Sequence, residues 1–147
     1  MQALPRLHPA CSAPSPARPP ACVLSRPGPL TLGACRLAEV PEELSARTSL
    51  FSLDLSENEV LDGGRQHLRP LRQLSALSLR GCRLAGVPAE LSALTLLSSL
   101  DLRGNQGLVG GWQHLRPLRQ LRALDTRFCS LAWVPQELFH LGSVIRI

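Results

Sequence analysis

The sequence contains no lysine and no tyrosine, and it is poor in aromatic residues of any kind. Only three Phe and two Trp occur among 147 residues, whereas Leu occupies 31 positions. A core built almost entirely from one aliphatic residue indicates a packing environment that repeats along the chain. No apolar run approaches the ~18 residues of a membrane-spanning helix, so a protein anchored by such helices is excluded.

Acidic residues are absent from residues 1–29, which carry three Arg and eight of the 13 prolines. From Leu30 onward 13 Arg face 11 Asp and Glu, so this part contributes only +2 of the net charge of +5. The charge therefore does not favour nucleic acid as a partner. We expect residues 1–29 to be a disordered Pro/Ala/Arg-rich leader, because proline cannot sustain helix or strand hydrogen bonding.

Two targeting functions are alternatives for this leader. It contains Arg and Ser without acid, as organelle transit peptides do, but its prolines disfavour the amphipathic helix that such peptides form. A secretory signal fits less well, since no apolar stretch of 7–15 residues follows the charge.

From Leu30 the chain repeats itself with two nested periods. Residues 35–81 laid over 82–128 without a gap are identical at 32 of 47 positions, and residues 129–147 match 82–100 at eight of 19. Within these units a pair of residues two positions apart recurs every 23 or 24 residues. The pairs are Leu30/Leu32, Leu53/Leu55, Leu77/Leu79, Leu100/Leu102 and Leu124/Thr126. A period in the twenties is typical of a solenoid.

The repeats resemble the leucine-rich repeat core, Leu-x-x-Leu-x-Leu-x-x-Asn/Cys-x-Leu, most clearly in residues 74–84 and 97–105. The resemblance covers residues 30–147, about four-fifths of the chain. The recurrent Val-Pro-x-Glu-Leu at 40–44, 87–91 and 134–138 is similar to plant-type and signalling-scaffold intracellular members. The pattern departs from the family where Pro27, Arg47 and Thr126 stand in place of Leu. The resemblance implies a protein-interaction role.

The residues themselves predict the same α/β architecture, a leucine-rich repeat solenoid of about five coils over residues 30–147. Alternation in segments such as Leu77-Ser78-Leu79 places both leucines inward and the middle residue outward, as in a strand. A second segment with leucines three apart (Leu68, Leu71) suits short helices or 3₁₀ turns. We therefore expect a short arc with parallel strands on its concave face and short helices or 3₁₀ turns on its convex face.

The cysteines of the repeats share one position with two asparagines. This predicted structural ladder comprises Cys35, Asn58, Cys82, Asn105 and Cys129. Cysteines on alternate coils should lie ~10 Å apart, too far for a disulfide or a shared metal ion. In the family this position faces inward and hydrogen-bonds the backbone at the turn. We expect unpaired thiols, no metal and no cofactor, and hence a reducing, cytoplasmic location.

No motif for catalysis is present. The sequence lacks a phosphate-binding loop ending in Lys, HExxH, GxSxG and CxxC. His67 and His114 recur with their whole coil, as do the Gly63-Gly64 and Gly110-Gly111 turns, so we interpret all of them as structural. The chain is therefore expected not to be an enzyme.

The outward positions of the predicted strands stack into two columns. One reads Thr31, Asp54, Ser78, Asp101, Asp125, and the other reads Gly33, Ser56, Arg80, Arg103, Arg127. Phe128 replaces Gly81 and Gly104 and adds an exposed ring at one end. The predicted partner-binding residues are Asp54, Ser56, Ser78, Arg80, Asp101, Arg103, Asp125, Arg127 and Phe128. The alternative for these positions is a solvated sheet face with partly compensated charge.

Three functions are consistent with this scaffold. The first is a non-catalytic protein-interaction module or scaffold that binds a protein on its concave face; in the family such proteins serve in signalling complexes and in cytoskeletal or ciliary assemblies. The second is an anionic-surface or nucleic-acid binder, and the third a regulatory subunit of an enzyme complex. The residues for the second are the convex set Arg69, Arg72, Arg116, Arg119 and Arg122.

The last repeat ends without a capping segment. Val144 and Ile147 align with Leu97 and Leu100, so the sequence would stop where a sixth strand begins. A terminal coil normally needs a polar cap over its last apolar layer. We therefore expect a chain that is marginally stable, that self-associates through its uncapped ends, or that is a C-terminally truncated fragment.

Overall fold

The computed structural model describes residues 28–147, with the backbone alone at 142–144. The predicted leader lies outside the described residues except for Gly28 and Pro29, so its predicted disorder and its targeting alternatives stay predictions.

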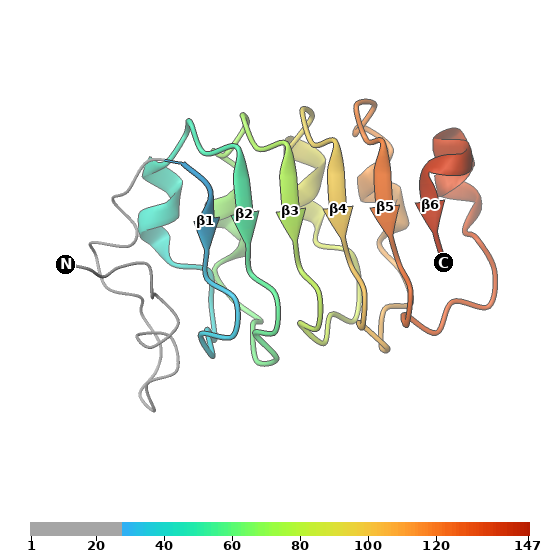
Figure 1. The fold of residues 1–147 in the computed structure, drawn as a ribbon, viewed down its shortest axis with the longest axis horizontal. Helices are drawn as coiled ribbons and strands as arrows, with labels where there is room; N and C mark the ends of the chain where they lie inside the picture. Colours follow the sequence, from blue (N-terminus) through green and yellow to red (C-terminus); the bar gives the residue numbers. More distant parts are fainter. Residues whose placement is uncertain (1–27) are drawn as a thin grey trace.

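Six short strands form one open parallel sheet in chain order (Figure 1). They are β1 (Leu30–Thr31), β2 (Ser52–Asp54), β3 (Ala76–Ser78), β4 (Ser99–Asp101), β5 (Ala123–Asp125) and β6 (Ile145–Arg146). In register, Leu53 lies opposite Leu77, and Leu77 lies opposite Leu100. These leucines are buried because alternate residues of a strand point to the same side.

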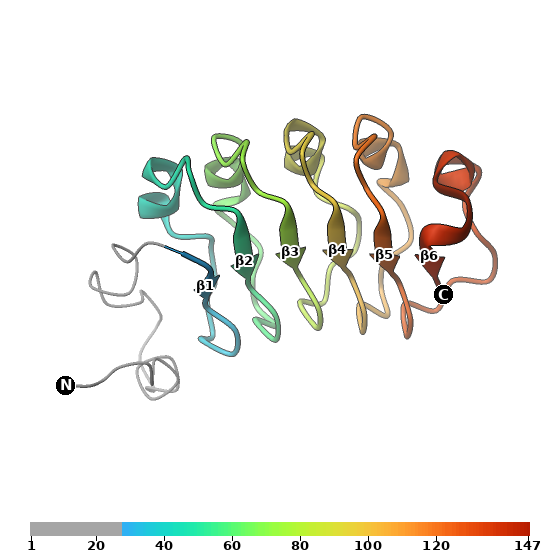
Figure 2. The same cartoon turned by 45° about the horizontal axis from the view of Figure 1, so that its top comes forward.

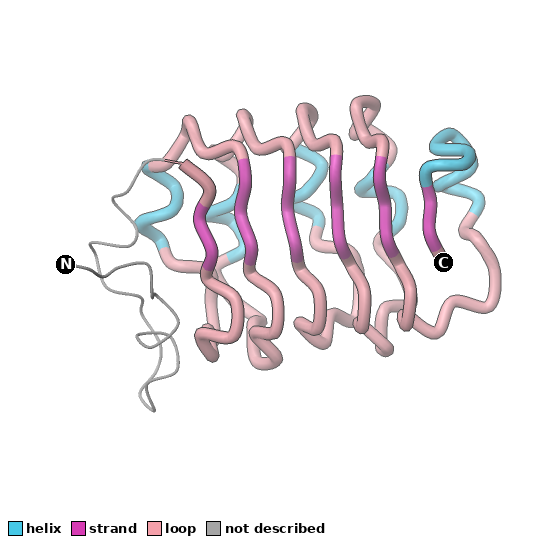
Figure 3. Tube along the Cα trace, viewed as in Figure 1, coloured by secondary structure: helices cyan, strands magenta, loops and turns pink. Residues whose placement is uncertain are grey.

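Each of the strands β1 to β5 is followed by a 3₁₀ segment on the other side of the molecule (Figures 2 and 3). These segments are η1 (Glu42–Ala46), η2 (Arg65–Leu68), η3 (Ala89–Ala93), η4 (Trp112–Leu115) and η5 (Gln136–Val144). Proline precedes η1, η3 and η5 with φ near −60°, whereas Gly64 and Gly111 precede η2 and η4 with φ of 70° and 83°. The prediction of a leucine-rich repeat solenoid is confirmed. We call the two sides the strand face and the 3₁₀ face.

The predicted alignment of the last repeat was wrong by two residues. Ile145, and not Ile147, lies opposite Leu124, so the final spacing is 21 residues instead of 23 or 24. Ile145 is half-buried, and Ile147 is 54 % exposed. The sixth strand therefore forms within the sequence. Thr126, which replaces a strand leucine, is buried and donates its hydroxyl hydrogen bond to the Arg146 carbonyl at 2.9 Å.

The coils are of two alternating kinds. We number each coil by the strand that begins it; odd coils carry Cys at the ladder position and Val-Pro before the 3₁₀ segment, and even coils carry Asn and Gly-Gly. We call the contacts between coils 1 and 2 and between coils 3 and 4 glycine junctions. Those between coils 2 and 3 and between coils 4 and 5 are cysteine junctions.

Glycine junctions are hydrogen-bonded far beyond the strands. Val40 and Val87 donate their amides to the carbonyls of Gly63 and Gly110, each at 2.9 Å, within short parallel bridges. A Cβ on Gly111 would lie 2.6 Å from the Val87 carbonyl oxygen, so this approach requires glycine. The glycines predicted as simple turns therefore also hold neighbouring coils together.

Cysteine junctions have fewer such bonds. The strands pair, and the amides of Glu57 and Gly104 bond the next coil just after the strand. Beyond that turn, the Ser98 amide donates to the Ser75 carbonyl at 2.8 Å between the ends of coils 2 and 3, and within residues 28–147 no backbone bridge like those of the glycine junctions joins coils 2 and 3 or coils 4 and 5. The solenoid thus consists of two-coil pairs with weaker contacts between them.

No helix in this part of the chain is long and apolar enough to cross a membrane.

Candidate functional site

The inward ladder position connects coils through side chains. The Asn105 amide donates to the carbonyls of Leu79 (3.0 Å) and Leu102 (2.7 Å), and its oxygen accepts from the amides of Cys82 (3.1 Å) and Leu84 (2.9 Å). Asn58 bonds coils 1 and 2 in the same way, through Leu32, Leu55 and Leu37. Each asparagine therefore satisfies buried backbone groups of two coils at once.

Two of the ladder cysteines are free thiols that act as hydrogen-bond donors. Cys82 Sγ donates to the Leu55 carbonyl at 3.2 Å, and Cys129 Sγ donates to the Leu102 carbonyl at 2.9 Å. Burial raises the pKa of the Cys82 thiol to about 11 and also raises that of Cys129. Protonated, buried thiols are poor nucleophiles and poor metal ligands. No group of three metal-ligating side chains occurs in the described part of the chain.

Cys35 corrects one expectation. It occupies the predicted inward position and is buried, but it is disulfide-bonded, whereas all thiols were expected to be unpaired. The distance argument considered only the repeat cysteines with one another, and the other two described cysteines are free thiols. The argument for a reducing compartment from unpaired thiols therefore no longer holds.

The strand face brings the predicted partner-binding residues together. Asp54, Ser78, Asp101 and Asp125 lie side by side in register on β2 to β5. Backbone bonds from Glu57 to Arg80, from Gly81 to Arg103 and from Gly104 to Arg127 place the neighbouring column in the same order, and Ser56 of that column is half-buried.

Every arginine of the second column is ion-paired. Arg103 donates two hydrogen bonds to Asp101, from Nε to Oδ1 at 2.9 Å and from a terminal guanidinium nitrogen to Oδ2 at 2.6 Å. Arg127 donates the same two bonds to Asp125, at 2.9 and 2.8 Å. Arg103 also lies 3.7 Å from Asp125, and Arg80 lies 3.3 Å from Glu57. The charge of this face is therefore compensated within the face, and its guanidinium groups are held in fixed orientations.

The pKa values follow these contacts. Burial acts to raise the pKa of the Asp125 carboxyl, but hydrogen bonds and charge from Arg127, with Arg103 nearby, outweigh it, so the pKa is lowered. The pKa values of Arg103 and Arg127 are raised, chiefly by their hydrogen bonds to Asp101 and Asp125. The Arg127–Asp125 pair therefore remains ionised across the physiological range.

Phe128 is exposed in a strained backbone conformation. Its φ is 63°, in the left-handed region, and its ring is 75 % exposed. Gly81 and Gly104 occupy the same position in coils 3 and 4 with φ of 65° and 73°. A bulky residue there costs about 1 kcal/mol or more relative to glycine. Ala34 and Glu57 adopt the same conformation in coils 1 and 2, with φ of 57° and 60°, so the left-handed turn belongs to the repeat and Phe128 differs from its equivalents by its exposed ring.

The convex arginines differ from those of the strand face. All five are exposed, and none takes part in an ion pair within the described residues. Arg69 and Arg116 directly follow η2 and η4 on the 3₁₀ face.

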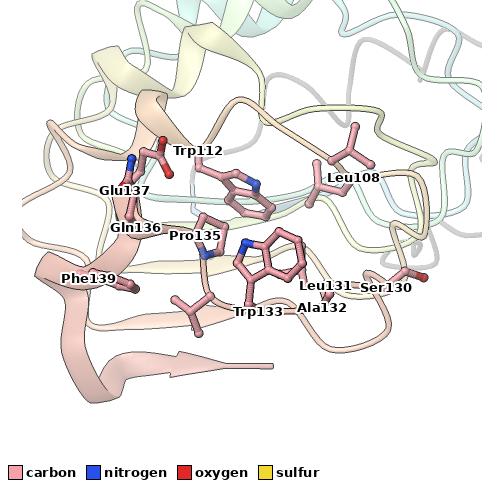
Figure 4. Close-up of a pocket in the computed structure, with 12 residues that line it drawn as sticks. Leu108, Trp112, Ser130, Leu131, Ala132, Trp133, Pro135, Gln136, Glu137 and Phe139 are labelled. Carbon is pink, nitrogen blue, oxygen red and sulfur yellow. The ribbon is translucent and has the colours of Figure 1, made fainter.

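Sequence reasoning missed an apolar pocket between coils 4 and 5. It has a volume of about 670 Å³, and its floor and rim include Trp112, Trp133 and Phe139, three of the five aromatic residues (Figure 4). We call it the indole pocket. Trp112 is buried, whereas Trp133 and Phe139 are 76 % and 67 % exposed. It opens at a cysteine junction, where backbone bonds between the loops are absent from the described structure.

A signal for this pocket was present in the sequence. Trp112 and Trp133 replace Arg65 and Gly86 of the preceding 47-residue unit, and Phe139 replaces Ser92. The search for repeated patterns passed over them, because aromatic residues that break a repeat carry no repeat signal.

The fold is shared with known proteins of low sequence identity. Internalin C2 of Listeria monocytogenes superposes with a TM-score of 0.63 at 19 % identity, covering 82 % of this chain and 50 % of that one. The leucine-rich repeat protein LIC12759 of Leptospira interrogans gives a TM-score of 0.52 at 20 % identity, covering 79 % and 35 %. LegL7, a leucine-rich repeat-containing protein of Legionella pneumophila, gives 0.52 at 20 %, covering 81 % and 45 %.

The chain thus spans half or less of each of these solved chains. No family model matches the sequence, and no curated protein sequence matches it. Whether its repeats are of the plant type stays a prediction. From its repeats, its parallel sheet and its structural neighbours, the chain is a leucine-rich repeat protein by fold.

Proposed function

We propose that the chain is a non-catalytic protein-interaction module that binds a protein partner through its strand face. The observation that carries the proposal is the ordered row of bidentate Arg–Asp pairs beside the strained, exposed Phe128. Arginine and aromatic side chains are the anchors that protein interfaces use most. A cytoplasmic role in signalling or at the cytoskeleton or cilium belongs to the same proposal.

The internal ion pairs suit a partner with charges of both signs. A guanidinium that is already oriented loses little freedom on binding, and its carboxylate partner offers further acceptor positions. A hollow of about 210 Å³ lies over β4 to β6, lined in part by Asp101, Asp125 and Arg146. The hollow gives the row of charged residues a concave feature where that row crosses coils 4 and 5.

The test compares three full-length proteins in affinity capture followed by calorimetry. The triple variant Arg80→Ala, Arg103→Ala, Arg127→Ala should lose the captured protein, with affinity at least 100-fold weaker. The quadruple variant Arg69→Ala, Arg72→Ala, Arg116→Ala, Arg119→Ala, on the 3₁₀ face, should retain it. Retained affinity in the folded triple variant would contradict the proposal.

Phe128→Gly separates binding from stability. Glycine relieves the left-handed strain, so the free energy of unfolding should stay the same or rise by up to about 1 kcal/mol. Binding of the captured protein should nevertheless weaken about tenfold or more, since an exposed anchor is lost. Unchanged affinity in this variant would show that Phe128 does not belong to the interface.

One observation favours a second candidate, an anionic-surface or nucleic-acid binder. The 3₁₀-face arginines are exposed without ion pairs among residues 28–147, whereas those of the strand face are neutralised. Binding of heparin or duplex DNA that falls steeply with salt and is lost in the quadruple variant would support this candidate. Salt-insensitive capture of one defined protein would favour the module.

A further inference from the structure

The indole pocket has the chemistry of a polyproline-binding groove. Two indoles, a phenyl ring and Pro135 surround it, and Figure 4 shows the Trp112 and Trp133 rings projecting into the same space. Aromatic-lined grooves bind proline-rich segments because the preformed left-handed helix of such a segment loses little entropy on docking. The exposed rings of Trp133 and Phe139 leave apolar area to cover.

One acidic group lies at this pocket. Glu137 is half-buried among the lining residues, and its carboxylate forms no ion pair within the described residues. A guanidinium or ammonium group on the occupant would therefore find an uncompensated charge next to the aromatic rings. The chain contains no lysine, so within this protein only arginine or the amino terminus could supply that charge.

The sequence outside the described residues contains a segment with these properties. Residues 12–20 read Ser-Ala-Pro-Ser-Pro-Ala-Arg-Pro-Pro, with four prolines and no acid. Pro16 and Pro19 are one polyproline turn apart, about 9 Å, and therefore share one face of such a helix. Arg18 lies between them, within reach of a carboxylate at the pocket.

We propose that the indole pocket binds residues 12–20 of a second copy of the chain. The pocket lies between coils 4 and 5, whereas β1, which the leader precedes, lies at the other end of the sheet (Figure 1). Docking within one chain would hold the nine residues from Pro19 to Gly28 extended along the intervening coils, at a cost in conformational entropy. Docking between chains needs no such extension and produces a head-to-tail assembly. The proposal is independent of the strand face.

Intrinsic fluorescence reports this site alone, because both tryptophans of the chain line the pocket and tyrosine is absent. A synthetic peptide of residues 12–20 should shift the tryptophan emission of the full-length protein in a saturable manner. A control peptide in which Pro16 and Pro19 are both replaced by alanine should not. No saturable shift up to about 1 mM, or equal shifts from both peptides, overturns the proposal.

Sedimentation velocity of the full-length protein tests the assembly, with reductant present so that disulfide exchange does not link chains. Association should rise with concentration and weaken at least tenfold in Trp133→Ala and in Pro16→Ala, Pro19→Ala. Glu137→Gln should weaken it about twofold to fivefold, as expected for one exposed ion pair.

Two matched controls should leave association unchanged. Phe51→Ala removes another exposed ring, 48 % exposed, that lies away from the pocket, and Pro5→Ala, Pro9→Ala removes two other leader prolines. Trp133→Ala should not impair folding, since the Trp133 side chain is 76 % exposed. A protein that remains monomeric at every concentration, or whose association survives Trp133→Ala, contradicts the proposal.

Discussion

Glycine junctions and cysteine junctions share the strand pairing and the backbone bond just after the strand, but they differ in the contacts between their loops. At a glycine junction an asparagine amide and a backbone bridge tie the two loops, as Asn105 and the Val87–Gly110 bond do between coils 3 and 4. At a cysteine junction a single thiol donates to the preceding coil. The repeating unit is therefore a pair of coils, and the weaker contact between pairs is where the indole pocket opens.

The largest expected effect comes from removing a ladder amide. Asn105→Ala leaves the amides of Cys82 and Leu84 and the carbonyl of Leu79 without that partner, while the Leu102 carbonyl keeps the Cys129 thiol, and should lower the free energy of unfolding by about 3 kcal/mol. The matched change at a cysteine junction, Cys129→Ala, removes one thiol donor and should cost about 1 kcal/mol. Urea denaturation measures both. Equal losses would show that the two junctions do not differ.

The next effect comes from the glycine that approaches its neighbour. Gly111→Ala places a Cβ against the Val87 backbone at a φ of 83° and should destabilise by about 2 kcal/mol or more. Gly110→Ala is the control, because a Cβ there meets nothing within 4 Å; it should cost less than about 0.5 kcal/mol. A thermal melt of each variant is sufficient, and similar melting temperatures would contradict the role assigned to Gly111.

A smaller effect is expected when one kind of ladder residue replaces the other. Cys82→Ser leaves a poorly matched small polar group inside and should destabilise by about 1–2 kcal/mol. Cys82→Asn should be tolerated better, since Asn58 and Asn105 fill the same position in the adjacent coils. The order is read from chemical denaturation. A Cys82→Asn variant less stable than Cys82→Ser would contradict the ladder assignment. Stoichiometric binding of zinc by the purified protein would contradict it too.

The smallest expected effect is a decrease in the free energy of unfolding above pH 9, which comes mainly from the cysteine thiols. Because the chain has no lysine and no tyrosine, few other groups titrate between pH 9 and 11. Folding raises the pKa of Cys82 to about 11, so its contribution is complete below the unfolded pKa and is lost as pH rises through 11. Stability should fall progressively above pH 9, and less steeply in Cys82→Ala. An identical slope in that variant would contradict the assignment.

The repeat predicted most of the fold, because each strand, turn and buried leucine recurs at a fixed spacing. It failed where the chain departs from the repeat. Ile145 rather than Ile147 continues the strand column because the last coil is two residues shorter. The argument from the distance between repeat cysteines also missed the disulfide at Cys35, since it compared those cysteines only with one another.

The site was predicted in part for the same reason. The outward columns follow from alternation, so the residues that the strand face brings together could be named, but their binding role is still a proposal. The ion pairs among these residues could not be predicted, because the pairing of Arg103 with both Asp101 and Asp125 depends on the direction of side chains across two coils. Trp112 and Trp133 are 21 residues apart and meet only because the loops of coils 4 and 5 face each other.

Native-state hydrogen exchange in low denaturant tests the two-coil unit most directly. If the pair is the cooperative unit, the amides of Leu84 and Val87 in coil 3 should share one opening free energy with those of Leu108 and Val109 in coil 4, since all four are bonded within this pair. That free energy should differ from the value for Leu61 and Asp62 in coil 2, which are bonded within the pair of coils 1 and 2. A single opening free energy for all six amides, or coil 3 opening with coil 2 rather than with coil 4, would contradict the account.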